Sequence, residues 1–308
     1  MSQLTYKTNT LKALSFLVIP FIILTISILL FRMDNTISYC FATILLSLFF
    51  TQTFILLHEC GHLNFFVSKL SNNLFGHLFG FLTGIPFIAW KHMHNLHHKW
   101  TGWRDLDPTT EKTVDIGKSI ILKQIVNVCW FLFIPLFYIS YFLSNYWNIF
   151  KIKRFLSERN FKLAFINIIL LLAIYVFLIV FYTSFLFKHI FPAFFLSFIW
   201  KELIIMTQHS HIEIPISEGS IVQPISYKEQ VKYSRSFYTN KFISKYFLFN
   251  FNLHEAHHLQ PGLPAYWLDK LEINSTKKTT YFEWFKKAKS LKGENYIFRT
   301  SKHTGKEI

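Results

Sequence analysis

The chain has 308 residues, of which 52% are hydrophobic, 37 are Phe and 14 are His, and its formal net charge at pH 7 is +15. So apolar a composition argues against nucleic-acid binding. The basic charge suits an anionic inner membrane leaflet, an acidic soluble partner, or positive-inside topology alone. Cys40, Cys60 and Cys129 are scattered, and they form neither a disulfide framework nor an iron–sulfur pattern.

Two apolar runs near the N-terminus are predicted membrane spans. Residues 11–31 carry one charge, Lys12 at their start, and residues 37–57 follow after a short polar turn. A helix needs about 20 apolar residues to cross the hydrocarbon core, so each run is long enough. A cleaved signal peptide is the alternative for the first run, but its basic start is weak and residues 28–32 offer no small-residue cleavage site.

The second run ends in the first of three histidine clusters, box one, which reads His58-Glu59-Cys60-Gly61-His62. Residues four apart share a helix face, so both imidazoles point the same way. The pattern is also H-E-x-x-H, in which zinc proteases place two ligands and a general-base Glu. Such a protease needs only one further ligand, so a protease would have no use for two more boxes of three histidines each. We expect Glu59 to support the site rather than to bind metal.

Box two is His94-Asn95-Leu96-His97-His98, in which positions i, i+3 and i+4 of a helix are predicted to converge. His92, just before it, points elsewhere. Apolar residues 74–90 separate boxes one and two. Because both boxes must share a side of the membrane to build one site, we predict that this stretch is re-entrant or interfacial. Asp105 and Asp107 could accept the second ring N–H of a ligating histidine, or they could form a solvated turn.

The span count follows from the requirement that all boxes share a side. Residues 163–187 and 190–206 are predicted spans that form an out-and-back hairpin with its tip, 188–189, outside. A further span at 124–143 would place box three opposite the other boxes, so we predict that this apolar segment is interfacial or re-entrant. Segment 151–162 carries five basic residues, which favours a cytoplasmic position.

Box three, His254-Glu255-Ala256-His257-His258, repeats the spacing of box two. Pro261, Gly262 and Pro264 follow and are predicted to end its helix at once. Glu255, like Glu59, is expected to support the site, because neighbouring positions on a helix point to different faces.

Five histidines lie outside the boxes and His92. His209 and His211 end the fourth predicted span on the side where the boxes lie, and we favour His209 as an additional ligand. His77, His189 and His303 are predicted to be incidental.

The boxes hold eight histidines, twice the number of ligands in a closed zinc site, which suits two metal ions. Imidazole without thiolate fits Fe, Zn, Cu or Ni. The sequence therefore predicts an all-α integral membrane protein with about four transmembrane helices and a cytoplasmic, histidine-rich cap. We assign residues 1–273 to this membrane domain and residues 274–308 to a basic polar tail.

In type, order and membrane layout, the three boxes resemble those of the membrane fatty acid desaturase superfamily, over about residues 44–267. Box one as H-E-C-G-H and the Pro-rich turn after box three are most similar to acyl-lipid desaturases. The resemblance implies a non-haem centre of two Fe ions, with O₂ as co-substrate and an extra histidine that matches His209 best. The implied ligands are His58, His62, His94, His97, His98, His209, His254, His257 and His258.

The resemblance implies an oxidoreductase acting on a lipid or acyl chain, because an unactivated C–H bond yields only to a strong oxidant. We expect a desaturase that introduces a C=C bond. A hydroxylase or a carotenoid ketolase or hydroxylase would use the same ligands, and a zinc protease and a non-enzymatic metal-binding membrane protein are further alternatives. Since the sequence shows no fused cytochrome b5 signature and no ferredoxin cysteines, electrons are expected from a separate protein of the ferredoxin or cytochrome b5 type.

Overall fold

The computed structural model describes residues 6–114, 119–273 and 279–308. In these ranges, helices are joined by loops, and one isolated β-bridge pairs Tyr238 with Thr280. The α-helices are α1 (Thr10–Phe31), α2 (Thr36–Gly61), α3 (Lys69–Thr83), α4 (Phe87–Trp100), α5 (Ile120–Phe131), α6 (Leu136–Phe142), α7 (Ile149–Phe155), α8 (Glu158–Phe185), α9 (Phe191–His209), α10 (Tyr227–Gln230), α11 (His254–Leu259), α12 (Ala265–Leu268), α13 (Tyr281–Lys289), α14 (Gly293–Phe298) and α15 (Ser301–Thr304). Short 3₁₀ or π-helical segments are η1 (Glu111–Thr113), η2 (Leu143–Trp147), η3 (Leu186–Ile190), η4 (Val231–Tyr233) and η5 (Ile243–Phe247).

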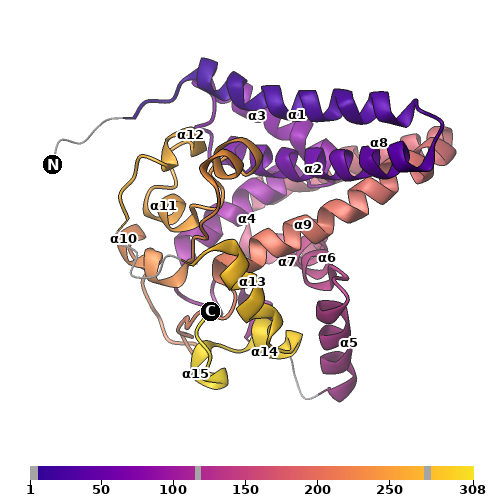
Figure 1. Cartoon of the computed structure of the whole chain (residues 1–308). Helices are drawn as coiled ribbons and strands as arrows, with labels where there is room; N and C mark the ends of the chain where they lie inside the picture. The colour runs from indigo at the N-terminus through magenta and orange to yellow at the C-terminus, as the bar shows by residue number, and fades with distance from the viewer. Residues whose placement is uncertain (1–5, 115–118, 274–278) are drawn as a thin grey trace.

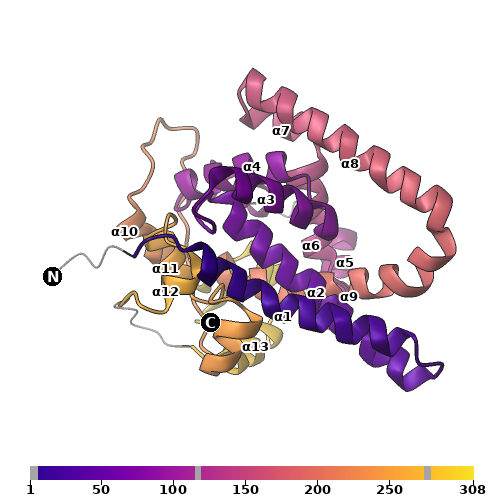
Figure 2. The same cartoon turned by 90° about the horizontal axis from the view of Figure 1, so that it is seen from above.

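Three continuous helical stretches of the described residues are long and apolar enough to cross a membrane, namely Thr10–Phe31, Thr36–Gly61 and Glu158–His209. The third has 52 residues, about 78 Å at 1.5 Å per residue, which far exceeds the roughly 30 Å of a bilayer core. Figure 2 shows why: the chain turns at η3, and α9 runs back from the end of α8. The predicted fold class, all-helical with several candidate membrane spans, is confirmed.

Side-chain caps set where these helices begin. The side chain of Asn9 accepts a hydrogen bond from the Lys12 backbone N–H, and Asn35 does the same for Ser38 at the start of α2. Each cap satisfies one of the backbone donors that a first helical turn leaves unpaired. The polar turn between the first two predicted spans therefore ends one helix and starts the next.

The two apolar stretches of ambiguous type each form a pair of helices with a sharp bend. α3 and α4 meet at 101°, and α5 meets the α6–η2 stretch at 111°, the geometry of a broken span or a re-entrant loop. Gly84 ends α3 in the left-handed conformation, with a φ of 74°, and Pro86 precedes α4. Because glycine tolerates a positive φ, the chain reverses here without strain. Box two thus returns to the same end of the molecule as box one.

The long helices extend to one side of the molecule, and the short helices α10, α11 and α12 lie at the opposite end. Figure 1 shows α1, α2, α8 and α9 reaching towards the turns on the right, while α10, α11 and α12 lie on the left. α2 is the central helix, in contact with α1, α3, α4 and α9. Its C-terminal half is almost entirely buried, and box one lies at the end of that half.

The C-terminal residues assigned to a polar tail contain three helices, α13 to α15, in their described part. Trp284 and Tyr296 are fully buried and pack with Trp130 of α5 and Met206 of α9. The Tyr296 hydroxyl donates a hydrogen bond to the Met206 carbonyl at 2.6 Å. The proposed boundary at residue 274 falls within 274–278, outside the described residues.

We predict that the η3 turn and α7 lie on opposite sides of the membrane. In a background without Cys40, Cys60 and Cys129, a membrane-impermeant maleimide added to intact cells should label Lys188→Cys but not Lys153→Cys. Both positions are exposed, so access depends on membrane side. Labelling of position 153 alone would contradict the span count, and the α5–α6 pair would be the first segment to reassign.

Candidate metal centre

Nine histidines converge into two adjacent groups at the buried end of α2. The first group holds His58, His62, His94, His98 and His257, and the second holds His97, His209, His254 and His258. Within each group, the candidate ligand atoms all lie within 4.8 Å of one another. These are the nine histidines singled out in the sequence, including His209, which the structure places in the second group while His211 lies elsewhere.

Helix geometry divides boxes two and three between the groups. On α4, His94 and His98 face the first group, whereas His97 faces the second. On α11 the division is reversed, because His254 and His258 join the second group and His257 the first. Residues four apart share a face and the third histidine projects to the side. A single box therefore serves both groups, rather than aiming all its imidazoles at one point as expected.

Within each group, several Nε2 atoms are in close contact. In the first group, His94 Nε2 lies 3.1 Å from His62 Nε2 and 3.0 Å from His98 Nε2, and His98 lies 2.9 Å from His257. In the second, the His209, His254 and His258 Nε2 atoms are 2.9–3.2 Å apart. All these contacts join the same type of atom, which is an acceptor in one imidazole tautomer and a donor in the other.

Hydrogen bonds at Nδ1 fix the tautomers of two of these rings. The Gln230 amide nitrogen donates to the His98 and Ile225 carbonyls, so its Oε1 must accept from His258 Nδ1, 3.2 Å away. The Tyr233 carbonyl accepts from His209 Nδ1 at 2.8 Å. With Nδ1 protonated, both neutral rings present a lone pair at Nε2, and these atoms are 3.2 Å apart. Two lone pairs in such contact repel unless a cation lies between them, so this donor set fits a metal ion.

Burial keeps the rings uncharged. Burial and the neighbouring His254 hold the pKa of His258 well below its ordinary value, and burial together with His209 does the same for His254. Neutral imidazole is the form that binds metal. His58 Nε2 is also buried without a hydrogen-bond partner among the described residues, as a ligand atom would be.

Acidic residues orient the histidines rather than joining either group. His97 Nδ1 lies 2.6 Å from Asp107 Oδ2, and His58 Nδ1 lies 3.0 Å from Glu59 Oε1. Asp105 instead accepts hydrogen bonds from the backbone and hydroxyl of Ser217. Of the two aspartates proposed to support a ligand, only Asp107 contacts one. Carboxylates in this position fix the ring orientation and strengthen the imidazole as a ligand.

The two glutamates inside the boxes are held by backbone groups. Glu59 Oε2 accepts from the Ala265 backbone N–H at 2.7 Å, and Glu255 Oε2 accepts from that of Ser236 at 3.3 Å. Glu59 thus ties box one to the start of α12, and Glu255 ties box three to the loop that contains Ser236. The carboxylate that would be the general base of an H-E-x-x-H protease is therefore engaged on both oxygens.

Gly61 in box one is required by close packing. A Cβ at this position would lie 2.1 Å from the ring of Trp90, which stacks on His94 with the centroids 4.5 Å apart. Any side chain here would displace Trp90 and, with it, an imidazole of the first group. The glycine thus lets box one and box two pack against each other.

The histidines outside the boxes have other partners, apart from His209. His211 Nδ1 lies 3.2 Å from the Asn295 carbonyl and its Nε2 lies 2.8 Å from Thr304 Oγ1, so it contacts the C-terminal helices. His189 packs against Phe31. His77, His92, His189 and His303 belong to neither histidine group.

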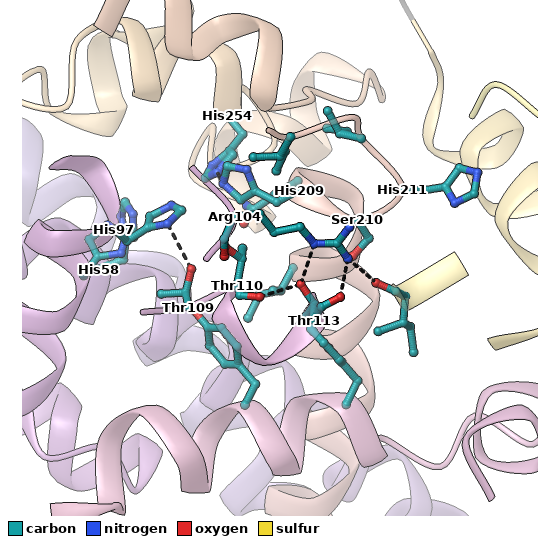
Figure 3. Close-up of a pocket in the computed structure, with 18 of the residues that line it drawn as sticks. His58, His97, Arg104, Thr109, Thr110, Thr113, His209, Ser210, His211 and His254 are labelled. Atoms are coloured by element: carbon teal, nitrogen blue, oxygen red, sulfur yellow. Dashed lines mark hydrogen bonds between the residues drawn. The ribbon is translucent and has the colours of Figure 1, made fainter. Parts of the chain in front are cut away.

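A cavity adjoins both groups, and Figure 3 shows its lining. His58, His97, His209 and His254 gather on one side, while His211 stands apart. Apolar side chains line part of the cavity, and its polar part contains Arg104 and several hydroxyls. The apolar residues include Phe54, Phe137, Ile205 and Phe251. The cavity thus brings apolar side chains close to histidines of both groups.

Sequence reasoning missed the residues that orient the rings from outside the boxes. Gln230 lies 28 residues before its partner His258, and Tyr233 contributes only its backbone carbonyl. No local pattern marks either position. A search for amide or carboxylate side chains between the last span and box three would have included Gln230 without distinguishing it.

Fold and site together define a helical membrane protein with a polyhistidine centre able to bind metal. The chain belongs to the fatty acid desaturase family, since the family described as "Fatty acid desaturase" matches residues 35–279. The resemblance to this family of oxidoreductases, drawn from the histidine boxes, is therefore confirmed.

Similarity to individual relatives is confined to short segments. The fatty acid desaturase of Bacillus subtilis is 41% identical over 56 residues, which cover 18% of this chain and 16% of the relative. An sn-1 acyl-lipid omega-3 desaturase (ferredoxin) of Nostoc is 39% identical over 66 residues, 20% of this chain and 18% of the relative. The oleate hydroxylase of Claviceps purpurea is 29% identical over 93 residues, which cover 28% of this chain and 19% of the relative. The chain thus matches less than a fifth of the length of each of these relatives.

Asp107 and Asp105 form a matched pair for testing ligand orientation. Asp107→Asn removes the charged acceptor of the His97 N–H and should lower metal affinity about 10–100-fold, the usual cost of losing such a partner. Asp105→Asn, whose partner is Ser217, should leave metal affinity unchanged. Metal per chain, measured by mass spectrometry at limiting metal, decides the outcome. Equal metal content in both variants would contradict the role of Asp107.

His209 and His211 form a second pair, only two residues apart. His209→Ala should lower the metal content, because it removes one of the four imidazoles of the second group. His211→Ala should keep the metal and lower the melting temperature, because it removes contacts to the C-terminal helices. Metal loss in His211→Ala with retention in His209→Ala would reverse the assignment.

Proposed function

We propose that this protein is a membrane-bound fatty acyl desaturase, which uses two iron ions and O₂ to introduce a C=C bond. The observation that carries the proposal is the pair of adjacent all-imidazole groups, in which lone pairs face each other across 3.2 Å. Five and four imidazoles are more than one metal ion needs. Members of the fatty acid desaturase family typically hold two irons, which supports iron over the other metals that imidazole accepts.

The assigned ligands of the first iron are His58, His62, His94, His98 and His257, and those of the second are His97, His209, His254 and His258. Iron bound there would supply, with O₂, the oxidant needed to break an unactivated C–H bond. In the overall reaction, the acyl chain loses two hydrogen atoms and gains a double bond. O₂ takes up those hydrogens with two protons and two external electrons, which gives two molecules of water.

The chain's own residues bind and orient the reactants. Phe54, Phe137 and Ile205 line the cavity beside the histidines and would hold the acyl chain there by excluding water from it. Asp107, Gln230 and the Tyr233 carbonyl keep three imidazoles in their metal-binding tautomer. These hydrogen bonds are independent of substrate, so the centre is arranged before the substrate enters.

We place the histidines on the cytoplasmic side and assign electron supply to a separate protein. The five basic residues at 151–162 support the first assignment through positive-inside topology. For the second, one relative carries ferredoxin in its name, which supports a donor of the ferredoxin type. A cytochrome b5 type donor would provide the same electrons.

Hydroxylation is the second candidate, favoured by the similarity to an oleate hydroxylase. Both reactions begin with removal of hydrogen from an acyl carbon. In desaturation a second hydrogen is then removed from the neighbouring carbon, whereas in hydroxylation an oxygen atom is added to the first carbon. The product therefore distinguishes them.

Expression with a compatible reductase and donor should introduce a double bond into the acyl chains of a host. Fatty acid profiling should detect a product two mass units lighter than its precursor, and His98→Ala should abolish it. The purified protein should carry close to two Fe per chain. A product heavier by one oxygen would instead favour hydroxylation, and changed pigments with unchanged acyl chains would favour a carotenoid-modifying activity. Activity in a form with one Zn and no Fe would rule out the di-iron proposal.

A further inference from the structure

Residues 226–233, which contain α10 and η4, are bonded directly to the histidine groups. Gln230 is fully buried, and it contacts both the His98 carbonyl at 2.7 Å and His258 Nδ1 at 3.2 Å. The Tyr233 carbonyl accepts from His209 Nδ1 at 2.8 Å. This one segment is therefore in hydrogen-bond contact with three of the nine histidines, from both groups.

The outer side of the same segment faces solvent and is basic. Lys228 and Lys232 are exposed, and no carboxylate in the described ranges forms an ion pair with either of them. Glu229 is the one acidic residue of the segment and accepts a hydrogen bond from Ser226. Lys228 and Lys232 are thus each two positions from Gln230 along the chain.

A third lysine extends this surface. Lys99 is exposed and directly follows His98 on α4. The turn after α4 lies beside the segment, because Trp103 Nε1 donates to the Gln223 carbonyl and a Cβ at Gly102 would touch Tyr233. We call Lys99, Lys228 and Lys232 the docking face.

The docking face points away from the predicted membrane. Figures 1 and 2 both place α10 at the opposite end of the molecule from the turn between α8 and α9. Positive charge on this side is therefore not explained by contact with an anionic bilayer. A soluble partner is the molecule that can reach it.

We propose that the docking face binds an acidic, soluble one-electron carrier protein and that electrons pass from it through the segment 226–233 to the histidines. The proposal rests on the proposed function, which requires two external electrons for each double bond, so two carrier molecules are oxidised per product. Electron transfer between proteins weakens steeply with distance. The route through Gln230 and Tyr233 is short. It is joined by hydrogen bonds to two imidazoles of the second group, those of His258 and His209, and to the backbone carbonyl of His98 in the first group. Opposite charges steer the two proteins into contact.

The test uses the full-length protein loaded with iron, with a plant-type ferredoxin as the acidic donor. Lys228→Glu/Lys232→Glu should weaken ferredoxin binding about tenfold or more at low ionic strength, and the difference should shrink in high salt. Turnover driven by reduced ferredoxin should fall at subsaturating donor. Turnover driven by dithionite, which needs no docking, should be unchanged.

Lys286→Glu/Lys287→Glu on α13 is the matched control, with the same charge change at two other exposed lysines. Its ferredoxin binding should equal that of the wild type. Three outcomes would overturn the proposal. The wild type and the docking-face variant bind ferredoxin equally, the wild type does not bind ferredoxin, or only the control variant binds it more weakly. If dithionite drives no turnover but the binding difference persists, the proposed function fails while the docking face stands.

Discussion

The structure depends on bringing neutral imidazoles into contact through their unprotonated nitrogens. In the second group, the Nε2 atoms of His209, His254 and His258 lie 2.9–3.2 Å apart. For His209 and His258, the partners at Nδ1 leave no proton on Nε2 to share. In a buried site of low dielectric, such contacts are costly without a cation and favourable with one. Metal binding is therefore expected to be coupled to the packing of the helices that carry the ligands.

The helices that meet at this point come from distant parts of the sequence. α2, α4, α9 and α11 each bring one or more histidines from their ends, and each is fixed by packing rather than by its own propensity. Gly61 allows Trp90 to approach box one, and Gly84 allows the chain to reverse before box two. Two glycines thus permit a close approach and a sharp turn that a larger residue would prevent.

The short segments around the boxes and the C-terminal helices support the centre. Gln230 and Tyr233 orient ligands from the α10–η4 segment. Glu59 ties box one to the backbone at the start of α12, and Glu255 ties box three to the backbone of Ser236. The C-terminal helices pack on α5 and α9 and contact His211, so they brace the helix that ends in His209. Apolar spans position the centre, whereas polar contacts set its chemistry.

Sequence alone identified the long apolar helices, the nine candidate histidines and the family, because apolar runs, i, i+4 spacing and box order are local properties of the chain. It assigned α13 to α15 to a polar tail, because their packing on α5 and α9 is a tertiary contact. It also identified Asp107 as a candidate partner, but it could not separate Asp107 from Asp105, two residues away. Tertiary structure decided that choice, the division of each later box between two groups, and the roles of Gln230 and Tyr233. These depend on which faces of distant helices meet, and hydrogen-bond partners 10 to 28 residues apart leave no periodic signal in the sequence.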